Sequence, residues 1–352
     1  MPLTWSKYDA AIVLDMLATP GPANVGESDL SRLSQQMLAH ARASGVTACN
    51  LTVSAVGPGT TVFEQTLANI AFWERELAEH PDILIKVLDS SGLAAAKRTR
   101  RLGLIFGFQD GTPFGNDVER VRQFYDLGVR VIQFTYNGRN PLGDGCLEPA
   151  NGGLTAFGRL CIESMHELGV LVDVSHVGIR TAWDTLHHSV KPIAVTHGGA
   201  GAVADVPRNK PDDLLKAIAA RGGVIGIYLM PYLRTEGQPH AEDFMRHLDH
   251  LLNLCGEDHV GIGSDLSLTP LDLNEHYRAA HAEVVRTRRQ LGIGAPSESE
   301  DVFTYVPELN SPRRLAMIAD MMLNAGYGSR CIEKVVGGNW MRLLAEVWSD
   351  RG

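Results

Sequence analysis

A chain of 352 residues, with 44% hydrophobic and 21% charged residues, has the length and composition of one large folded domain. Its formal net charge of −9 argues against a nucleic-acid partner, because such a partner needs a basic surface. No stretch reaches the about 18 apolar residues that mark a membrane-spanning helix, so we expect no membrane partner.

The five cysteines are scattered, with no CxxC spacing, and their number is odd. This pattern favours reduced thiols over a disulfide framework. The first residues lack the basic segment and long apolar core of a signal peptide, so we expect a cytoplasmic protein. The densest basic run, KRTRR at 97–101, is more typical of a solvated turn between a helix and a strand than of a phosphate site.

Short apolar runs of strand length alternate with longer helical patterns almost from end to end. This alternation is typical of repeated βα units on a parallel sheet. The sequence predicts eight strands, at residues 11–15, 48–53, 102–109, 129–134, 170–174, 193–196, 223–228 and 260–264.

Amphipathic segments between these strands predict helices, among them 61–78, 117–127, 155–168 and 210–220. Thr155 is a suitable N-cap, and Asn209 precedes two acidic residues that suit a first turn. Periodicity alone fits either a closed barrel or an open doubly wound sheet. Eight strands without a glycine fingerprint after the first favour a (β/α)₈ TIM barrel, with residues 1–352 as a single domain.

The longest irregular region, residues 266–315, follows the last predicted strand and contains a charged helical pattern at 273–291. Loops after barrel strands form the catalytic face, so this insertion is a candidate lid or dimer element. Surface decoration is the alternative interpretation.

Polar residues at the carboxyl ends of barrel strands are expected to face the active site. Reading only those ends selects Gln109, Asp110, Tyr136, Asn137, Arg139, Asp173, His176, His197 and Asp265. Two histidines and an aspartate suit a metal site, whereas a single histidine is more often structural. We expect Asp173 to orient its neighbours by hydrogen bonds rather than to bind a metal. Histidines on helical patterns, such as His166 and His247, are expected at the surface.

Five segments resemble the membrane (renal) dipeptidase family of the amidohydrolase superfamily, in order and spacing. They are LVDVSHVG (171–178), PIAVTHGGA (192–200), VPRNKPDDLLKAIAARGGVIGI (206–227), HVGIGSD (259–265) and GGNWMRLL (337–344). The resemblance implies a metal-dependent hydrolase with two zinc ions. It assigns metal ligation to His176, His197 and Asp265, and binding of the substrate carboxylate to Arg208.

The chain departs from the family pattern at three places. Where the family has Asp-Gly-His-x-Asp on its first strand, residues 15–19 read Asp-Met-Leu-Ala-Thr, and the bridging glutamate is replaced by Gln109. The family histidine after strand four is replaced by Tyr136. Two adjacent dications would repel strongly with so few carboxylates. We therefore expect one divalent metal at most, zinc by resemblance, held by His176 and His197 with help from Gln109 or Asp265.

The leading hypothesis is a dipeptidase-like hydrolase that cleaves a dipeptide or another small carboxylated amide. Asp265 would act as general base and then acid, and Tyr136 would donate to the oxyanion. Arg208, Asn137 and Arg139 are the candidate substrate-binding residues. A metal-free lyase or isomerase, or an inactive small-molecule binding protein, is the alternative. The resemblance also implies a homodimer; Trp340 and Trp348 could serve its interface, although burial in the core fits them better.

Overall fold

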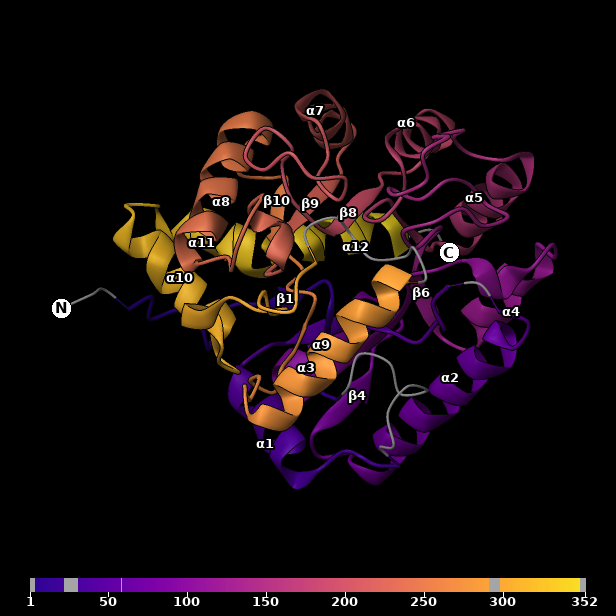
Figure 1. Cartoon of the computed structure of the whole chain (residues 1–352). Helices are drawn as coiled ribbons and strands as arrows, with labels where there is room; N and C mark the ends of the chain where they lie inside the picture. Colours follow the sequence, from indigo (N-terminus) through magenta and orange to yellow (C-terminus); the bar gives the residue numbers. More distant parts are fainter. Residues whose placement is uncertain (1–3, 22–30, 58, 291–297, 349–352) are drawn as a thin grey trace.

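The structure, a computed structural model, describes residues 4–21, 31–57, 59–290 and 298–348. Eight parallel strands form a nearly closed barrel, in the order β1, β3, β5, β6, β7, β8, β9, β10 (Figure 1). Their bounds are β1 Leu14–Asp15, β3 Ala48–Thr52, β5 Leu102–Phe108, β6 Val129–Gln133, β7 Leu171–Asp173, β8 Ala194–Gly198, β9 Val224–Ile227 and β10 Val260–Ile262. All eight predicted strands and the TIM-barrel fold class are confirmed. The short strand β4 (Leu84–Lys86), which pairs with β5, was not predicted.

The seam between the last and first strands closes the ring. Met16 N donates to Ile262 O at 3.0 Å, and Asp265 N donates to Leu17 O at 2.7 Å. Just beyond, β2 (Ala18–Thr19) pairs in parallel with β11 (Leu266–Ser267). The buried Asp15 carboxylate crosses the seam, since it accepts from Ser264 N at 2.7 Å and from Ser264 Oγ at 2.6 Å.

Helices surround the strands. They are α1 Gln35–Ser44, α2 Val62–Glu79, α3 Ser90–Thr99, α4 Glu119–Asp126, α5 Ala156–Leu168, α6 Ile179–His188, α7 Asp212–Ala220, α8 Ala241–Cys255, α9 Glu275–Gln290, α10 Arg314–Asn324, α11 Ser329–Glu333 and α12 Asn339–Trp348. Short 3₁₀ turns lie at Thr112–Phe114, Pro231–Leu233 and Pro307–Leu309, and a π-helical turn at Lys334–Gly338.

The predicted helices are confirmed, with small differences at their ends. Thr155 caps α5 as expected, because its hydroxyl accepts from Gly158 N at 2.9 Å. Asn209 does not cap α7: the N-cap is Pro211, and the Asn209 side chain instead donates to two backbone carbonyls. The expected acidic residues do occupy the first turn of α7.

Helix α12 seals the barrel at the amino ends of its strands. Trp340 is fully buried and donates from Nε1 to Ile262 O at 3.1 Å. A Cβ atom on Gly261 would lie 2.3 Å from Trp340 Nε1, so only glycine leaves room for the indole. Leu343 and Leu344 pack with it against inward-facing strand residues such as Val131. The expectation that Trp340 is buried is confirmed.

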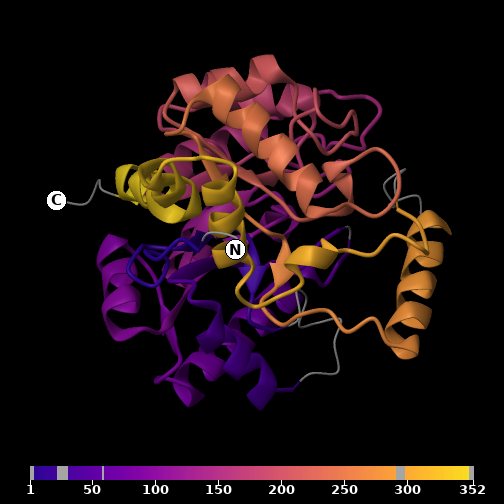
Figure 2. The ribbon, with the colours of Figure 1, turned by 90° about the vertical axis from the view of Figure 1, so that its left-hand side faces the viewer.

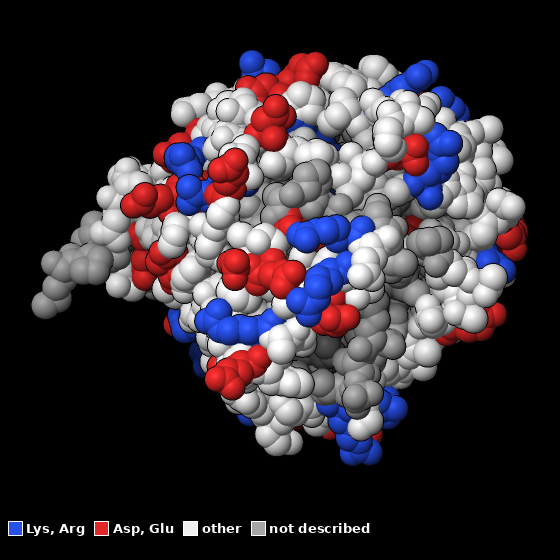
Figure 3. Space-filling model, viewed as in Figure 1, with Lys and Arg blue, Asp and Glu red and all other residues white. Residues whose placement is uncertain are grey.

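Helix α9 lies on the other side of the barrel from α12. In Figure 1 it crosses in front of the strands, and in Figure 2 the two helices stand at opposite edges. Acidic and basic side chains are interspersed on the face shown in Figure 3. Among the described residues, no helix has both the length and the apolar character needed to cross a bilayer.

Replacing Trp340 with alanine should lower the free energy of unfolding by about 3–5 kcal/mol, because the floor of the barrel would lose its largest side chain and retain a cavity. Denaturant unfolding followed by circular dichroism measures this change. Leu160→Ala is the control, since Leu160 is 51% exposed on α5; that change should cost about 0.5 kcal/mol or less. Equal losses in the two variants would contradict the role assigned to Trp340.

Candidate active site

Two histidines lie side by side at the carboxyl ends of neighbouring strands. His176 follows β7, His197 lies within β8, and both side chains are buried. Their ring centroids are 5.0 Å apart. The carboxyl ends of parallel strands form the catalytic face of a barrel. The pair therefore lies where it was predicted by the strand-end rule, that is, the expectation that polar residues at the carboxyl ends of barrel strands face the active site.

Asn137 determines which ring nitrogen of His176 carries the hydrogen. Its Oδ1 atom lies 2.8 Å from His176 Nδ1, and an amide oxygen can only accept, so Nδ1 carries the hydrogen. The lone pair of His176 is therefore on Nε2. That atom is buried and has no hydrogen-bond partner among the residues that the structure describes. A buried polar atom without a partner is costly, which marks Nε2 as the place for a ligand.

Asp173, acting through Thr196, determines which ring nitrogen of His197 carries the hydrogen. The Thr196 hydroxyl donates to Asp173 Oδ2 at 2.5 Å, which leaves its oxygen to accept from His197 Nδ1 at 2.8 Å. The lone pair of His197 is therefore also on Nε2. Asp173 also accepts from the Ser175 hydroxyl and so orients residues beside both histidines, as predicted.

Both histidines are held in the neutral form. Burial, followed by the positive charge of Arg208, lowers the pKa of His176 and of His197 well below the ordinary value. Neutral imidazole is the state that donates a lone pair to a metal ion.

Gln109 contacts His197 and lines a small cavity. Its Nε2 atom is 3.3 Å from His197 Nε2, and its Oε1 accepts from the Thr52 hydroxyl at 3.0 Å. The cavity, of about 30 Å³, is lined by Leu17, Ala18, Thr19, Thr52, Gln109, Asp265 and Leu266. Gln109 and Asp265 are thus brought together with the residues that replace the expected first-strand ligands.

Asp265 has an unusual backbone and an unusual acidity. Its φ angle is 60°, in the left-handed region that few non-glycine residues adopt. Part of its side chain faces the cavity, yet the surrounding protein is dense enough that burial raises the pKa of the carboxyl to about 7. A carboxyl that titrates near neutrality is suited to both accept and return a proton.

Arg208 is a buried cation with unused donors. It is 1% exposed, and its Nη1 donates to Ser175 O at 2.6 Å. Its Nε and Nη2 have no hydrogen-bond partner within the described ranges. The guanidinium carbon lies 5.7 Å from the ring centre of Tyr228 and 5.9 Å from that of Tyr232. Two free donors on one face of a guanidinium match the two oxygens of a carboxylate.

The remaining predicted residues divide between the site and the surface. Tyr136 stacks on His176 with ring centroids 4.3 Å apart, and burial raises the pKa of its phenol. Arg139 instead binds Asp144 at 2.6 Å and 3.1 Å, with half of its side chain exposed. The structure does not bring Arg139 into contact with the two histidines.

The chain matches the family model for membrane dipeptidase, peptidase family M19, over residues 10–289. It belongs to the membrane dipeptidase family. The predicted recognition and the predicted class, a dipeptidase-like hydrolase, are therefore confirmed at the level of the family.

Three relatives illustrate the similarity. An uncharacterized protein in the pqqA 5′ region of Klebsiella pneumoniae is 29% identical over 292 residues, 80% of this chain and 95% of that protein. An uncharacterized dipeptidase of Schizosaccharomyces pombe is 31% identical over 220 residues, 60% of this chain but 53% of the relative. The crystal structure of an amidohydrolase from Pseudomonas aeruginosa is 27% identical and superposes with a TM-score of 0.80, covering 97% of this chain and 98% of that one.

This membrane dipeptidase homologue differs at the barrel mouth from the two-zinc pattern that the resemblance implies. Leu17 and Thr19 line the small cavity at the barrel mouth, at the positions where the resemblance implies a histidine and an aspartate. Gln109 is uncharged, whereas the resemblance implies a bridging glutamate at that position. Within the described ranges, no three histidine, cysteine, aspartate or glutamate side chains gather closely enough to hold a metal ion. His176 and His197 present two neutral ring nitrogens, and their Nδ1 hydrogens are already bound.

Several residues at the mouth were not predicted. Thr52, at the end of β3, holds the Gln109 amide, and the strand-end rule applied to that strand would have selected it. Lys210 is fully buried, donates to Val177 O, and burial lowers its pKa to about 8. In the segment after β11, Arg288 pairs with Glu298 at 2.9 Å. The positive charge of Arg288 acts to lower the pKa of Tyr136, against the larger effect of burial.

Two histidines were wrongly expected at the surface. His247 is fully buried in α8, where its ring accepts from Ala200 N and contacts Leu233 O. His166 is 8% exposed in α5. Helical periodicity shows that a residue lies on a helix, but it does not show which of its faces a neighbouring segment covers.

Asp265→Asn should change the pH dependence of stability. The folded carboxyl has a pKa of about 7 and the unfolded one 3.8, so the folded state retains a proton that the unfolded state releases between these values. Wild-type stability should therefore fall as pH rises from 4 to 7, by up to about 4 kcal/mol from this group. The asparagine variant has no carboxyl to titrate, so its stability should not fall in this way. The free energy of unfolding of the variant minus that of wild type should therefore increase from pH 4 to pH 7. Urea unfolding at several pH values measures the difference, and a constant difference would contradict it.

Proposed function

We propose that this chain hydrolyses the amide bond of a dipeptide or of a similarly small carboxylated amide, with one divalent cation at most. The observation that carries the proposal is the pair of neighbouring buried, neutral histidines whose Nδ1 hydrogens are bound, which leaves both lone pairs on Nε2. Membership of a family named for dipeptidases supports this substrate class. None of the comparisons favours the lyase, isomerase or binding-protein alternatives.

His176 and His197 are the proposed ligands of the cation, zinc by analogy with the family, with Gln109 as a weak third. When bound, the ion would supply Lewis acidity to the scissile carbonyl. Gln109 can turn its amide oxygen toward His197 only by giving up the Thr52 hydrogen bond, which limits its strength as a ligand.

Asp265 is the proposed proton carrier. As a carboxylate it accepts the proton of the attacking water, and as an acid it returns that proton to the departing amine. Its pKa of about 7 allows both states near neutral pH. Tyr136, stacked on His176, is the proposed donor to the developing oxyanion.

Arg208 is the proposed anchor of the substrate carboxylate, because Nε and Nη2 are buried without partners. Asn137 and Arg139 stay predicted substrate-binding residues. The Asn137 oxygen serves His176, so its amide hydrogens are the part available to a substrate carbonyl. Arg139 would have to leave Asp144 to reach the site.

We also propose that the segment 266–315, of which 291–297 lie outside the described residues, is a lid or dimer element of the single domain formed by residues 1–352. Arg288 and Glu298 of this segment lie near the mouth, and Tyr232 Oη is 3.4 Å from Glu298 Oε1. A cytoplasmic location is supported by the five cysteines, none of which is in a disulfide. A homodimer is proposed by analogy with the family.

His176→Ala should abolish hydrolysis of dipeptides and the binding of the metal together, because it removes one of two nitrogen ligands. Activity assays and elemental analysis of the same preparation test this. His188→Ala is the control. His188 ends α6 and pairs with Glu163 of α5, so its loss should change neither the hydrolysis rate nor the metal content. Full activity of His176→Ala would rule out the mechanism. Two fully occupied ions in the wild-type protein would overturn the proposal of a single cation.

Gln109→Glu should tighten the binding of one zinc ion by about tenfold or more, because a carboxylate close to a dication is attractive even at a high effective dielectric. Isothermal titration calorimetry measures the affinity. The stoichiometry should stay at one, because Leu17 and Thr19 remain. Gln123→Glu adds the same charge on the exposed face of α4 and should leave the affinity unchanged. An unchanged affinity in Gln109→Glu would place the cation elsewhere.

A further inference from the structure

A second cavity opens at the amino ends of the strands, on the face opposite the histidines. Its volume is about 320 Å³. It is lined by residues that precede β3, such as Gly45 and Thr47, by the first residue of β5, Leu102, and by the turn after α3. Pockets for small molecules begin at about 300 Å³, so this one is large enough for a compact ligand.

Cations dominate the lining of this basal pocket. They come from the helices α1 and α3, from the turn that follows α3, and from the residue before α10; they are Arg42, Lys97, Arg100, Arg101 and Arg313. Asp9 is the sole carboxylate among the lining residues. Asp82, which pairs with Arg42 at 2.5 Å, is the other acidic neighbour, so cations outnumber carboxylates by three. The chain as a whole carries a charge of −9, so this concentration of positive charge runs against its composition.

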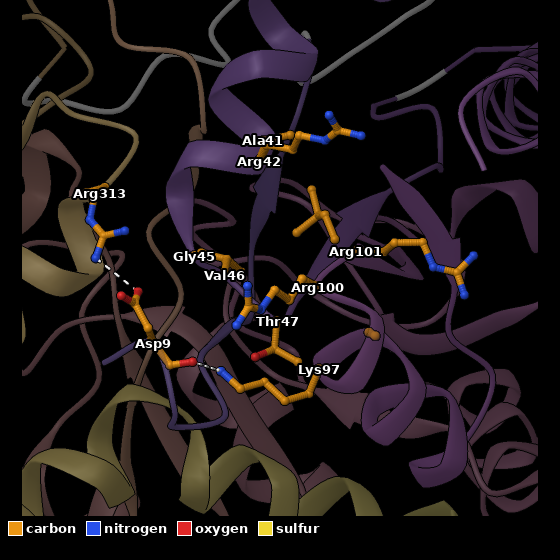
Figure 4. Close-up of a pocket in the computed structure, with 12 residues that line it drawn as sticks. Asp9, Ala41, Arg42, Gly45, Val46, Thr47, Lys97, Arg100, Arg101 and Arg313 are labelled. Atoms are coloured by element: carbon orange, nitrogen blue, oxygen red, sulfur yellow. Dashed lines mark hydrogen bonds and ion pairs between the residues drawn. The ribbon is translucent and has the colours of Figure 1, made fainter. Parts of the chain in front are cut away.

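Most of these cations have partners among the described residues, and Arg100 is the exception there. Arg313 pairs with Asp9 at 3.2 Å, and Lys97 donates to Asp9 O at 2.9 Å. Figure 4 marks both contacts with dashed lines, and no such line reaches Arg100. Within the described part of the chain, the Arg100 guanidinium makes no recorded hydrogen bond or ion pair, and Figure 4 shows it among the residues that line the pocket, beside Val46 and Thr47.

The backbone of Arg100 has a left-handed conformation. It ends α3 with a φ of 54°, in the left-handed region where helices usually place glycine. The sequence analysis favoured a solvated turn for the basic run 97–101. The first three residues of the run end α3, and the last two form the turn to β5. Arg98, Thr99 and Arg100 are exposed, in agreement with that prediction, and Arg100 and Arg101 also line the cavity.

We propose that the basal pocket binds a small molecule that carries a phosphate or pyrophosphate group. Several arginines around one cavity present planar forks of N–H donors, which match phosphate oxygens. Arg100 supplies the unused donors, and Arg313 can exchange Asp9 for the ligand, since that ion pair is largely exposed. A nucleic acid is a poor match for the ligand, because the chain as a whole carries a formal net charge of −9.

A bound anion would join segments that are far apart in the sequence. The lining residues come from the segment before β1, from α1, from the turn after α3 and from the start of α10. A ligand that binds only this folded arrangement raises the melting temperature by mass action. The site is therefore detectable without any assay of hydrolysis.

Titration of the full-length protein with inorganic pyrophosphate, by calorimetry and by thermal shift, tests the proposal. Binding should be saturable and should weaken as salt is added. Arg100→Gln should lower the affinity about tenfold, because it removes a charge-assisted contact. The matched control is Arg98→Gln, an identical change two residues away on an exposed position that does not line the pocket; its affinity should stay within about twofold of wild type.

Arg100→Gly provides a second variant, since glycine suits the left-handed backbone and removes the same cation. It should lose affinity as Arg100→Gln does. No binding of millimolar pyrophosphate to the wild-type protein would overturn the proposal, and so would an equal loss in Arg98→Gln, which would indicate general attraction rather than a site. Equal affinity for malonate would contradict the assignment to phosphate.

Discussion

The seam between the last and first strands is the constraint on which the rest of the site depends. A buried Asp15 carboxylate accepts two hydrogen bonds from Ser264, and burial raises its pKa. These contacts hold the end of β10 against β1 and set Asp265 beside Leu17. The barrel is thereby closed at the point where Asp265 lines the cavity. Asp15 contributes to this closure through its oxygens, which accept hydrogen bonds from Ser264 and from Leu17 N.

Charge at the mouth differs from what two metal ions would need. Arg208, Lys210 and Arg288 bring positive charge to the region, and the first of these lowers the pKa of both site histidines. Asp265, with a pKa of about 7, is only partly ionised at neutral pH. A second dication would therefore enter a site already rich in cations. An anionic substrate group, in contrast, is attracted to the same surroundings.

Much of the fold followed from the sequence, since the apolar runs of all eight barrel strands are short, buried and separated by helical patterns. The strand-end rule found His176 and His197 for the same reason: parallel strands bring their carboxyl ends to one face. It did not show how the imidazole protons are fixed, because the Asn137 and Thr196 contacts depend on side-chain geometry. The basal pocket was also beyond sequence reasoning, since its lining comes from segments some three hundred residues apart, with Asp9 at one end and Arg313 at the other.

The position of Trp340 has a consequence for biosynthesis. The inward-facing residues of the strands share their core with α12, which follows β10 by more than seventy residues in the chain. As the ribosome produces the chain, the strands emerge before the side chains that fill the floor of their barrel. Until Trp340 arrives, the ring has exposed apolar surface at its base, and such surface attracts chaperones and promotes aggregation. Completion of the barrel is in this way coupled to completion of synthesis through α12.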